Sequence, residues 1–257
     1  MSSEKASLSR GNILGVNVSA TNMDQALKII DDWIERREQN YVCVTPAHGV
    51  MDCQYQPELR EIFNKSGLTT PDGMAIVWIL KLKGFPHVSR VYGPDLMLAV
   101  CNRSPTMGYR HFLYGGNSNV PEALAFNLQS RFPGLNIVGT YSPPFHPLTI
   151  EEDSKIVEMI NCAQPDVVWV GLSTPKQEMW MAEHLGKINA PVMIGVGAAF
   201  DFLSGNKRQA PRWVQRNGLE WLFRLFTEPA RLWRRYVQYP VFIILVLAQL
   251  VGLKKYP

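Results

Sequence analysis

The sequence lacks the features that mark several classes of protein. Four of its 257 residues are cysteines, and Cys43, Cys53, Cys101 and Cys162 show no paired spacing. Cysteines scattered in this way argue against a disulfide framework and against a zinc site. The N-terminal segment MSSEKASLSR is polar and has none of the apolar core of a secretory signal. We therefore expect a cytosolic protein.

A long apolar run is also missing. The most apolar segment, VFIILVLAQLVGL at residues 241–253, has thirteen residues and is followed by Lys254 and Lys255. A helix needs roughly 20 apolar residues to cross a bilayer. The segment is therefore expected to dip into a membrane interface rather than to span the membrane.

A complete dinucleotide fingerprint is not present. Gly115 and Gly116 lie between a predicted strand and a predicted helix, where glycine lets a phosphate approach the backbone and the helix dipole favours negative charge. They do not complete G-x-G-x-x-G, and the next strand, at 135–141, ends without the acidic residue that holds a ribose in NAD enzymes. These absences count against NAD, and a plain strand-to-helix turn stays open as the alternative for the two glycines.

Paired aspartates of the D-x-D type are absent from the strand-end loops of residues 1–204. Such a pair is the usual oxygen-ligand site for magnesium beside a sugar nucleotide. No metal site and no cofactor are therefore predicted.

The charges are unevenly divided along the chain. The net charge is +4, but from Gly205 onward ten Lys or Arg face two acids, Glu220 and Glu228, which gives +8 and leaves −4 for residues 1–204. A basic tail on a mildly acidic body indicates a polyanionic partner for the tail, either nucleic acid or anionic lipid.

The first two hundred residues alternate short β-rich runs with helical runs, which is typical of parallel α/β architecture. Strands are predicted at 12–18, 41–46, 110–116, 135–141, 166–172 and 191–197, and helices at 23–37, 73–83, 93–103, 120–132 and 151–163. Thr21 is the expected N-cap of the first helix.

We predict an α/β fold with two Rossmann-like parallel-sheet units and a helical tail. The polar segment 102–108 is the expected boundary, because Ser, Pro and Gly cluster there. The predicted units are an N-terminal acceptor and catalytic-base unit (1–107), a UDP-sugar-binding unit (108–205) and a membrane-associating appendage (206–257).

Several polar residues follow predicted strands, where the ligands of parallel sheets collect. Asp72 in Thr-Thr-Pro-Asp-Gly is either a turn residue or a carboxylate placed to act as a general base. Arg90 is either a surface cation or a neutralising partner for a diphosphate. Gln177 and Glu178 open a helix, where capping alone is the simpler interpretation.

Seven motifs together give the sequence a family resemblance. They are TPAHGVM, TTPDGMAIVW, RVYGPDLM, FLYGGN, GTYSPPF, VGLSTPKQE and GVGAAFDFLSG. In this order and spacing, from about Ile13 to Gly205, the chain resembles the WecG/TagA/CpsF glycosyltransferases, glycosyltransferase family 26. The resemblance implies transfer of a sugar from a UDP-sugar to a polyprenyl-diphosphate-linked saccharide, with inversion and without a metal. The sugar itself (N-acetylmannosamine, its uronic acid, glucose or a similar one) stays open.

The matching motifs imply roles for single residues. By this resemblance Asp72 is the general base, Thr45 and Arg90 line the reaction centre, and Gln177 contacts the donor sugar or the diphosphate. Inversion needs a base to take the proton of the acceptor hydroxyl and cationic or N–H donors to stabilise the leaving diphosphate. One carboxylate with such donors is sufficient for this chemistry.

The remaining positions concern the nucleotide. Tyr141 and Asp201 fall where family members hold the uridine. The first motif departs from the common Thr-x-Asn pattern, because Thr45 is followed by Pro-Ala. We expect His48 to take over the contact of the missing Asn.

The tail has a basic amphipathic pattern. One helical stripe is apolar and contains Leu219, Leu222, Phe226, Ala230, Trp233 and Val237. The opposite side carries Arg224, Arg231 and Arg235. The sequence Thr-Glu-Pro at 227–229 predicts that a second helix begins there.

The tail is expected to hold the protein at the cytoplasmic face of the bacterial inner membrane as a peripheral enzyme. Its arginines are expected to complete the active site against the lipid diphosphate, as the resemblance implies. A helix packed on the body or at the interface of a homo-oligomer is the alternative. Nucleic acid is disfavoured as a partner, because a basic arm does not need the apolar run at 241–253.

Two other functions stay open at this point. A dinucleotide-dependent oxidoreductase is disfavoured by the incomplete glycine fingerprint. A non-catalytic nucleotide-binding scaffold at the membrane would bind a UDP-sugar without turning it over.

Overall fold

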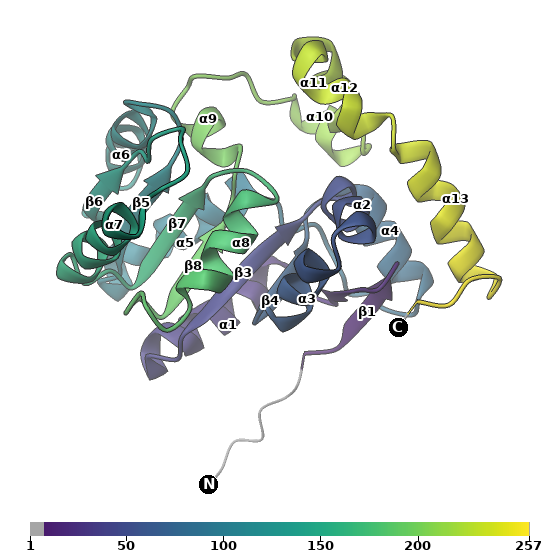
Figure 1. The fold of residues 1–257 in the computed structure, drawn as a ribbon, viewed down its shortest axis with the longest axis horizontal. Coiled ribbons are helices and arrows are strands. Elements are labelled where there is room, and N and C mark those ends of the chain that lie inside the picture. The colour runs from purple at the N-terminus through teal and green to yellow at the C-terminus, as the bar shows by residue number, and fades with distance from the viewer. Residues whose placement is uncertain (1–7, 257) are drawn as a thin grey trace, which may run out of the picture.

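The protein is built around a six-stranded sheet, shown in Figure 1 by the computed structural model, which describes residues 8–256. Every strand pair in this sheet is parallel, and the strand order is β4-β3-β8-β7-β5-β6. The strands are β3 (Asn40–Thr45), β4 (Leu68–Pro71), β5 (Arg110–Gly115), β6 (Asn136–Tyr141), β7 (Val167–Gly171) and β8 (Val192–Gly195). The prediction of a parallel α/β fold is confirmed.

Helices connect the strands and cover both faces of the sheet (Figure 1). They are α1 (Met23–Arg36), α2 (Ala47–Tyr55), α3 (Pro57–Lys65), α4 (Met74–Leu82), α5 (Gly93–Met107), α6 (Val120–Arg131), α7 (Ile150–Cys162), α8 (Lys176–His184) and α9 (Ala199–Leu203). Because both faces are buried, the inner strands β7 and β8 are continuous apolar runs rather than alternating patterns.

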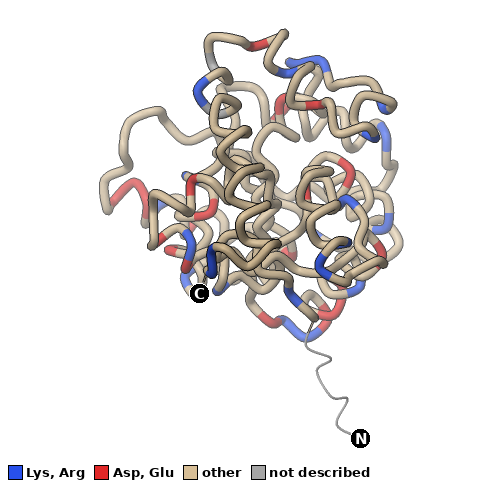
Figure 2. The backbone as a smooth tube through the Cα atoms, turned by 90° about the vertical axis from the view of Figure 1, so that its right-hand side faces the viewer, with Lys and Arg blue, Asp and Glu red and all other residues tan. Residues whose placement is uncertain are grey.

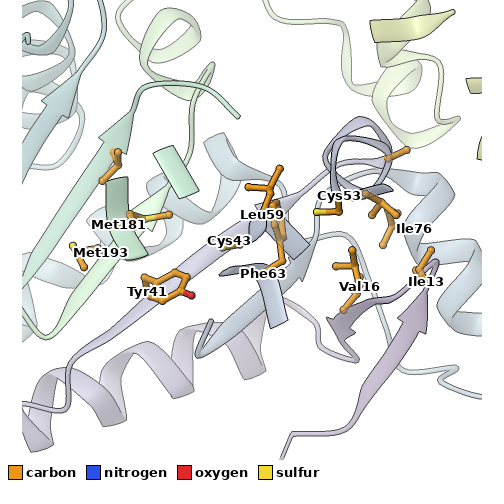
Figure 3. Packing of buried hydrophobic residues seen from close by; sticks show 14 of the residues in the cluster. Ile13, Val16, Tyr41, Cys43, Cys53, Leu59, Phe63, Ile76, Met181 and Met193 are labelled. Atoms are coloured by element: carbon orange, nitrogen blue, oxygen red, sulfur yellow. The ribbon is translucent and has the colours of Figure 1, made fainter. Parts of the chain in front are cut away.

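The hydrophobic core has two layers, one on each face of the sheet. Successive side chains of a strand point to opposite faces. On β3, Tyr41 and Cys43 pack with residues of α2, α3 and α8, as Figure 3 shows for Phe63 of α3. Val42 and Val44 pack with α1 and α5 on the other side. This alternation explains why β3 is apolar from Tyr41 to Val44.

The N-terminal segment predicted as one strand is a hairpin, so this prediction was wrong. Strands β1 (Arg10–Ile13) and β2 (Val16–Ser19) pair antiparallel. The two residues between them, Leu14 and Gly15, have φ of 51° and 87°. Two successive residues with positive φ form the type I′ turn that the twist of a hairpin favours. Gly15 was the signal for this turn.

The predicted N-cap Thr21 was also wrong. Thr21 is fully buried, and α1 is capped by Asn22. The Asn22 side chain accepts a hydrogen bond from the Gln25 N–H, and the Gln25 side chain accepts one from the Asn22 N–H. This reciprocal arrangement is a capping box, which satisfies two donors at the helix start.

The polar segment at 102–108 is helical rather than a loop, although its Ser, Pro and Gly predicted a loop. Residues 102–107 are the last turns of α5, and Gly108, with φ of 73°, ends the helix. Ser104 points inwards, where its hydroxyl bonds the Val100 carbonyl and the His111 ring. The strands of residues 1–107 and 108–205 join in one continuous sheet through the pair β3 and β8. The division into two Rossmann-like units stays a prediction.

The tail folds into four helices, α10 (Arg212–Arg216), α11 (Glu220–Thr227), α12 (Pro229–Tyr236) and α13 (Tyr239–Leu250). The helix start predicted at 227–229 is confirmed. The side chains of Arg231 and Arg235 lie outside the described part of the structure, so their place opposite the apolar stripe stays a prediction. Across residues 8–256, every helix is too short or too polar to cross a membrane.

Helix α13 lies along the body beside α2 and α4 (Figure 1). Phe242 and Val246 are buried in the same core layer as α2. Gln249 Oε1 accepts a hydrogen bond of 3.1 Å from the Leu14 N–H in the hairpin turn. The alternative of a helix packed on the body therefore holds for one face of α13.

Candidate active site

The site lies at the carboxyl ends of the central strands, where the chain leaves neighbouring strands in opposite directions. After β3 the chain enters α2, which packs on one face of the sheet, and after β8 it enters α9, which packs on the other. A crevice opens at such a switch point, and in open α/β sheets ligands bind there.

Two pockets meet in this crevice. The sheet-side pocket, of about 610 Å³ including its open mouth, is lined by the ends of β3, β7 and β8 and by α9. The tail-side pocket, of about 600 Å³, is lined by α4, α11 and the helices that follow. Four residues line both pockets: Pro46, His48, Asp72 and Arg224. A ligand in either pocket therefore reaches the Asp72 side chain.

Asp72 is held in place by its backbone on the loop that follows β4. Its N–H donates to the Thr45 carbonyl at 3.2 Å, and its carbonyl accepts from Arg90 Nε. The Gly93 N–H donates to Asp72 Oδ1 at 3.4 Å. Asp72 thus occupies a defined place at the end of two neighbouring strands, as a catalytic group requires.

Burial raises the pKa of Asp72 from 3.8 to about 6, and the negative charge of Glu220 acts in the same direction. The charges of Arg90 and Arg224 and the hydrogen bond from Gly93 oppose this rise. A carboxylate with a pKa near 6 is ionised at neutral pH and accepts a proton more readily than an ordinary aspartate.

Arg90 links Asp72 to the tail. Its Nη2 donates to Glu220 Oε2 at 2.6 Å, and the Tyr92 hydroxyl donates to Glu220 Oε1 at 2.7 Å. The Arg90 guanidinium also stacks 3.9 Å from the centre of the Tyr92 ring. Glu220 is buried, so the end of α11 is part of the wall of the site.

Arg224, on the same helix, faces the two pockets. Its guanidinium lies 5.5 Å from the centre of the Phe202 ring, and its Nε is buried without a hydrogen-bond partner among residues 8–256. A guanidinium presents five N–H donors in a fixed fork that matches phosphate oxygens. Arg224 is therefore suited to hold an anion between the pockets.

The sheet-side pocket gathers further predicted residues. Gln177 stands on the first turn of α8, His48 on the first turn of α2 and Asp201 on α9, and all three line the pocket. Asp201 pairs with Lys207 at 3.0 Å, and Lys207 in turn pairs with Glu228 at 2.9 Å. The pocket is thus connected to the start of α12.

Thr45 does not line either pocket. Its side chain is fully buried and its hydroxyl donates to the Cys43 carbonyl at 3.0 Å. Its backbone carbonyl accepts from the Asp72 N–H, which makes Thr45 a support beneath Asp72. A direct role of its side chain in the reaction centre stays a prediction.

Gly115, Gly116 and Tyr141 lie at the ends of β5 and β6 and do not line the two pockets. A Cβ at Gly115 would come within 2.7 Å of the Gly171 backbone, and φ there is 127°. This position needs glycine for packing alone. Tyr141 stacks parallel to Tyr114, with ring centres 6.2 Å apart. Nucleotide contacts of these three residues stay predictions.

Sequence reasoning did not name Glu220, Tyr92 or Arg224 as single site residues. It predicted only that arginines of the tail complete the site. Glu220 carries a signal that was available, because it is one of just two acids in a strongly basic segment. Its pairing with Arg90, 130 residues away along the chain, is visible only in the folded protein.

The sequence is similar to those of known glycosyltransferases. The chain is 31% identical to an N-acetylglucosaminyldiphosphoundecaprenol N-acetyl-beta-D-mannosaminyltransferase of Bacillus spizizenii over 206 residues, which is 80% of this chain and 77% of that protein. It is 26% identical to the protein of the same name from Staphylococcus aureus (strain NCTC 8325 / PS 47), over 90% of each chain. The sequence model of the Glycosyl transferase WecG/TagA/CpsF family matches residues 11–256. The chain therefore belongs to the WecG/TagA/CpsF family of glycosyl transferases.

Proposed function

We propose that this protein transfers N-acetylmannosamine from its UDP-activated form to a polyprenyl-diphosphate-linked N-acetylglucosamine, with inversion at the anomeric carbon and without a metal. The observation that carries the proposal is the position of Asp72 between two pockets. A transferase must hold two substrates on either side of one base, and this arrangement provides it.

The relatives support the choice of sugar and acceptor. Their names describe transfer of N-acetyl-beta-D-mannosamine to N-acetylglucosaminyldiphosphoundecaprenol. The matches to these relatives span 80% and 90% of this chain, and the family match over residues 11–256 includes the residues that line both pockets. N-acetylmannosamine is therefore the first donor sugar to test, before its uronic acid and glucose.

In the proposed reaction the UDP-sugar occupies the sheet-side pocket and the acceptor sugar occupies the tail-side pocket. Asp72 takes the proton from the acceptor hydroxyl while the oxygen attacks the anomeric carbon from the face opposite UDP. The new bond from carbon to oxygen forms as the bond to the UDP oxygen breaks, and UDP leaves with the electron pair. Arg224 stabilises the negative charge that develops on the diphosphate.

The tail-side pocket has the chemistry of a sugar site. Trp221, Tyr236 and Tyr239 line it and pack against one another, with ring centres 5.1 to 5.9 Å apart. Aromatic rings present flat apolar faces with a polar edge, which suits the C–H faces and the hydroxyls of a pyranose. Glu220 and Gln215 add polar groups to the same wall.

Exposed apolar side chains on the tail support a peripheral place at the cytoplasmic face of the inner membrane. Ile244 and Leu247 on α13 are 64% and 55% exposed, and Val251, the C-cap residue of this helix, is 68% exposed on the same side. In Figure 2 the helices above the body carry Lys and Arg, whereas α13 is free of charged residues. Apolar residues flanked by basic ones favour binding to anionic lipid, where a lipid-linked acceptor resides.

The deciding experiment has two stages. Purified protein is first screened for thermal stabilisation by a panel of UDP-sugars, with NADH as the control for an oxidoreductase. It is then supplied with the stabilising donor and a short-chain lipid-diphosphate N-acetylglucosamine, with and without a chelator, and the product is identified by mass spectrometry. Transfer of N-acetylmannosamine that the chelator does not inhibit is the expected result. Binding without transfer would contradict the proposal and favour a scaffold.

A further inference from the structure

Three polar side chains form a buried cluster at the wall of the sheet-side pocket, where the chain passes from β7 into α8. Gln177 Nε2 donates to Glu178 Oε1 at 2.9 Å, and Thr174 Oγ1 donates to the same oxygen at 3.0 Å. All three residues are buried, and Glu178 has no exposed surface. Thr174 and Gln177 line the pocket, whereas Glu178 stands behind them.

The cluster fixes which end of the Gln177 amide is free. Glu178 Oε1 accepts from the Thr174 hydroxyl and from the Gln177 amide nitrogen, so the amide turns its nitrogen towards Glu178. Gln177 Oε1 then lies against Gly197, where an added Cβ would be 3.2 Å away. Oε1 is buried and has no hydrogen-bond partner within residues 8–256. A buried acceptor left unpaired destabilises the protein, and a hydrogen-bond donor of a ligand would remove that cost.

We infer that Glu178 is a positioning residue, which holds Gln177 so that its carbonyl oxygen accepts a hydrogen bond from a hydroxyl or N–H group of the UDP-sugar. The inference rests on the proposed function. It makes Gln177 the hydrogen-bond acceptor and the UDP-sugar the donor in this contact. Diphosphate oxygens are acceptors as well, so they do not suit this carbonyl oxygen. The family resemblance left the donor sugar and the diphosphate open as contacts of Gln177, and the geometry points away from the diphosphate. The donor sugar and the uridine both offer hydroxyl or N–H groups for this contact.

The surroundings of Glu178 agree with a positioning role. Its second oxygen, Oε2, is buried and has no hydrogen-bond partner among the described residues. Burial raises the pKa of Glu178 to about 7, against the effect of the hydrogen bonds from Gln177 and Thr174. A buried carboxyl with an unpaired oxygen destabilises the fold, and an apolar side chain of similar size would avoid that cost. Glu178 is therefore explained by a function, which is to orient the Gln177 side chain.

The inference is tested by calorimetric titration of full-length variants with UDP and with UDP-N-acetylmannosamine. Glu178→Met removes the oxygen that holds the amide, and we expect the Kd of the UDP-sugar to rise about 5- to 30-fold, the loss of roughly one hydrogen bond. Gln177→Ala should cause a similar rise. In the double variant Glu178→Met should add less than about twofold, because it acts only through Gln177. Glu178→Gln keeps the accepting oxygen and should restore the Kd to within about threefold of the wild type.

The two ligands distinguish the donor group. A loss confined to UDP-N-acetylmannosamine assigns the contact to the transferred sugar, and a loss with both ligands assigns it to the uridine. Glu183→Met, an exposed substitution on the same helix, is the matched control and should bind as the wild type does.

Three results would overturn the inference. These are wild-type binding by Glu178→Met, independent losses that multiply in the double variant, and a folded Glu178→Gln that binds as weakly as Gln177→Ala. The last comparison remains decisive if Glu178→Met does not fold. Failure of the wild-type protein to bind any UDP-sugar would instead overturn the proposed function, and the inference with it.

Discussion

Glu220 on α11 and Arg90 in the body form an ion pair of 2.6 Å between Oε2 and Nη2, although 130 residues separate them in sequence. Both side chains are largely buried, and Arg90 also donates to the Asp72 backbone carbonyl. The tail is therefore part of the site. It supplies one wall of the crevice in which Asp72 lies and bears on the charge of that carboxyl.

Replacement of the proposed base is the first prediction. Asp72→Asn keeps the shape of the side chain but cannot take a proton, so transfer should fall about 10²- to 10⁴-fold while UDP binding is largely retained. Steady-state kinetics and calorimetry measure the two effects. Asp24→Asn, an exposed change on α1, serves as the control and should be fully active. Near-normal turnover by Asp72→Asn would exclude Asp72 as the base.

The pH dependence follows from the raised pKa of Asp72. The carboxyl must be ionised to accept a proton, so transfer should rise with pH through about 6 and then level off. The folded protein holds this proton more tightly than the unfolded chain, whose pKa is near the ordinary 3.8. Asp72 therefore contributes stability at low pH that is lost as the pH rises through about 6.

Thermal unfolding at several pH values tests whether Asp72 lowers the stability of the fold as the pH rises. As the pH rises from 4 to 7, the free energy of unfolding of Asp72→Asn should increase relative to that of the wild type. A rate profile that is flat across pH 5 to 7, or a stability difference that shrinks over this range, would contradict the raised pKa.

Removal of the negative charge of Glu220 should shift the pH-rate profile of transfer. Glu220 raises the pKa of Asp72, so in Glu220→Gln the acidic limb of the rate profile should move to lower pH. The variant should also lose about 1 to 3 kcal/mol of unfolding free energy, because the hydrogen bonds to Arg90 and Tyr92 lose their charged acceptor. Denaturant unfolding and pH-rate profiles measure both, with exposed Glu158→Gln as the control. An acidic limb at the wild-type position would show that Glu220 does not act on Asp72.

Membrane binding is best tested on the exposed face of α13. Deletion of residues 206–257 would also remove Phe242 and Val246, which are buried in the core of the body. Ile244→Glu combined with Leu247→Glu leaves these contacts intact and should lower binding to anionic phosphatidylglycerol vesicles at least about tenfold, since two apolar groups are replaced by charges that the lipid repels. Vesicle co-sedimentation is the measurement.

The matched control replaces two exposed aromatic residues away from the tail, Phe126→Glu and Phe145→Glu, which are 71% and 84% exposed in the wild type. It should sediment with vesicles as the wild type does. Equal binding by the α13 variant would refute the membrane role of this face.

Most of the strands and helices could be predicted from the sequence because they depend on local patterns, although α2, α3 and α9 were not predicted. The parallel strands are β-rich runs of four to six residues, and the helices between them repeat their apolar residues at the helical period. The hairpin was missed because Gly15 is the only glycine or proline in the β-rich run at 12–18. The end of α5 was missed because Ser104 and Pro105 resemble a loop, although Ser104 is buried and bonded to His111.

The sequence alone determined a parallel α/β body, a basic amphipathic tail and Asp72 at a strand end, since periodicity, charge and turn residues act over a few positions. Only the tertiary structure decided that Glu220 and Arg224 enter the site, that Thr45 supports Asp72 from below, and that Gln177 turns its nitrogen to Glu178. Those relationships join residues from different strands and helices. Packing sets them, through the strand order and the docking of α11, and no local pattern along the chain encodes either.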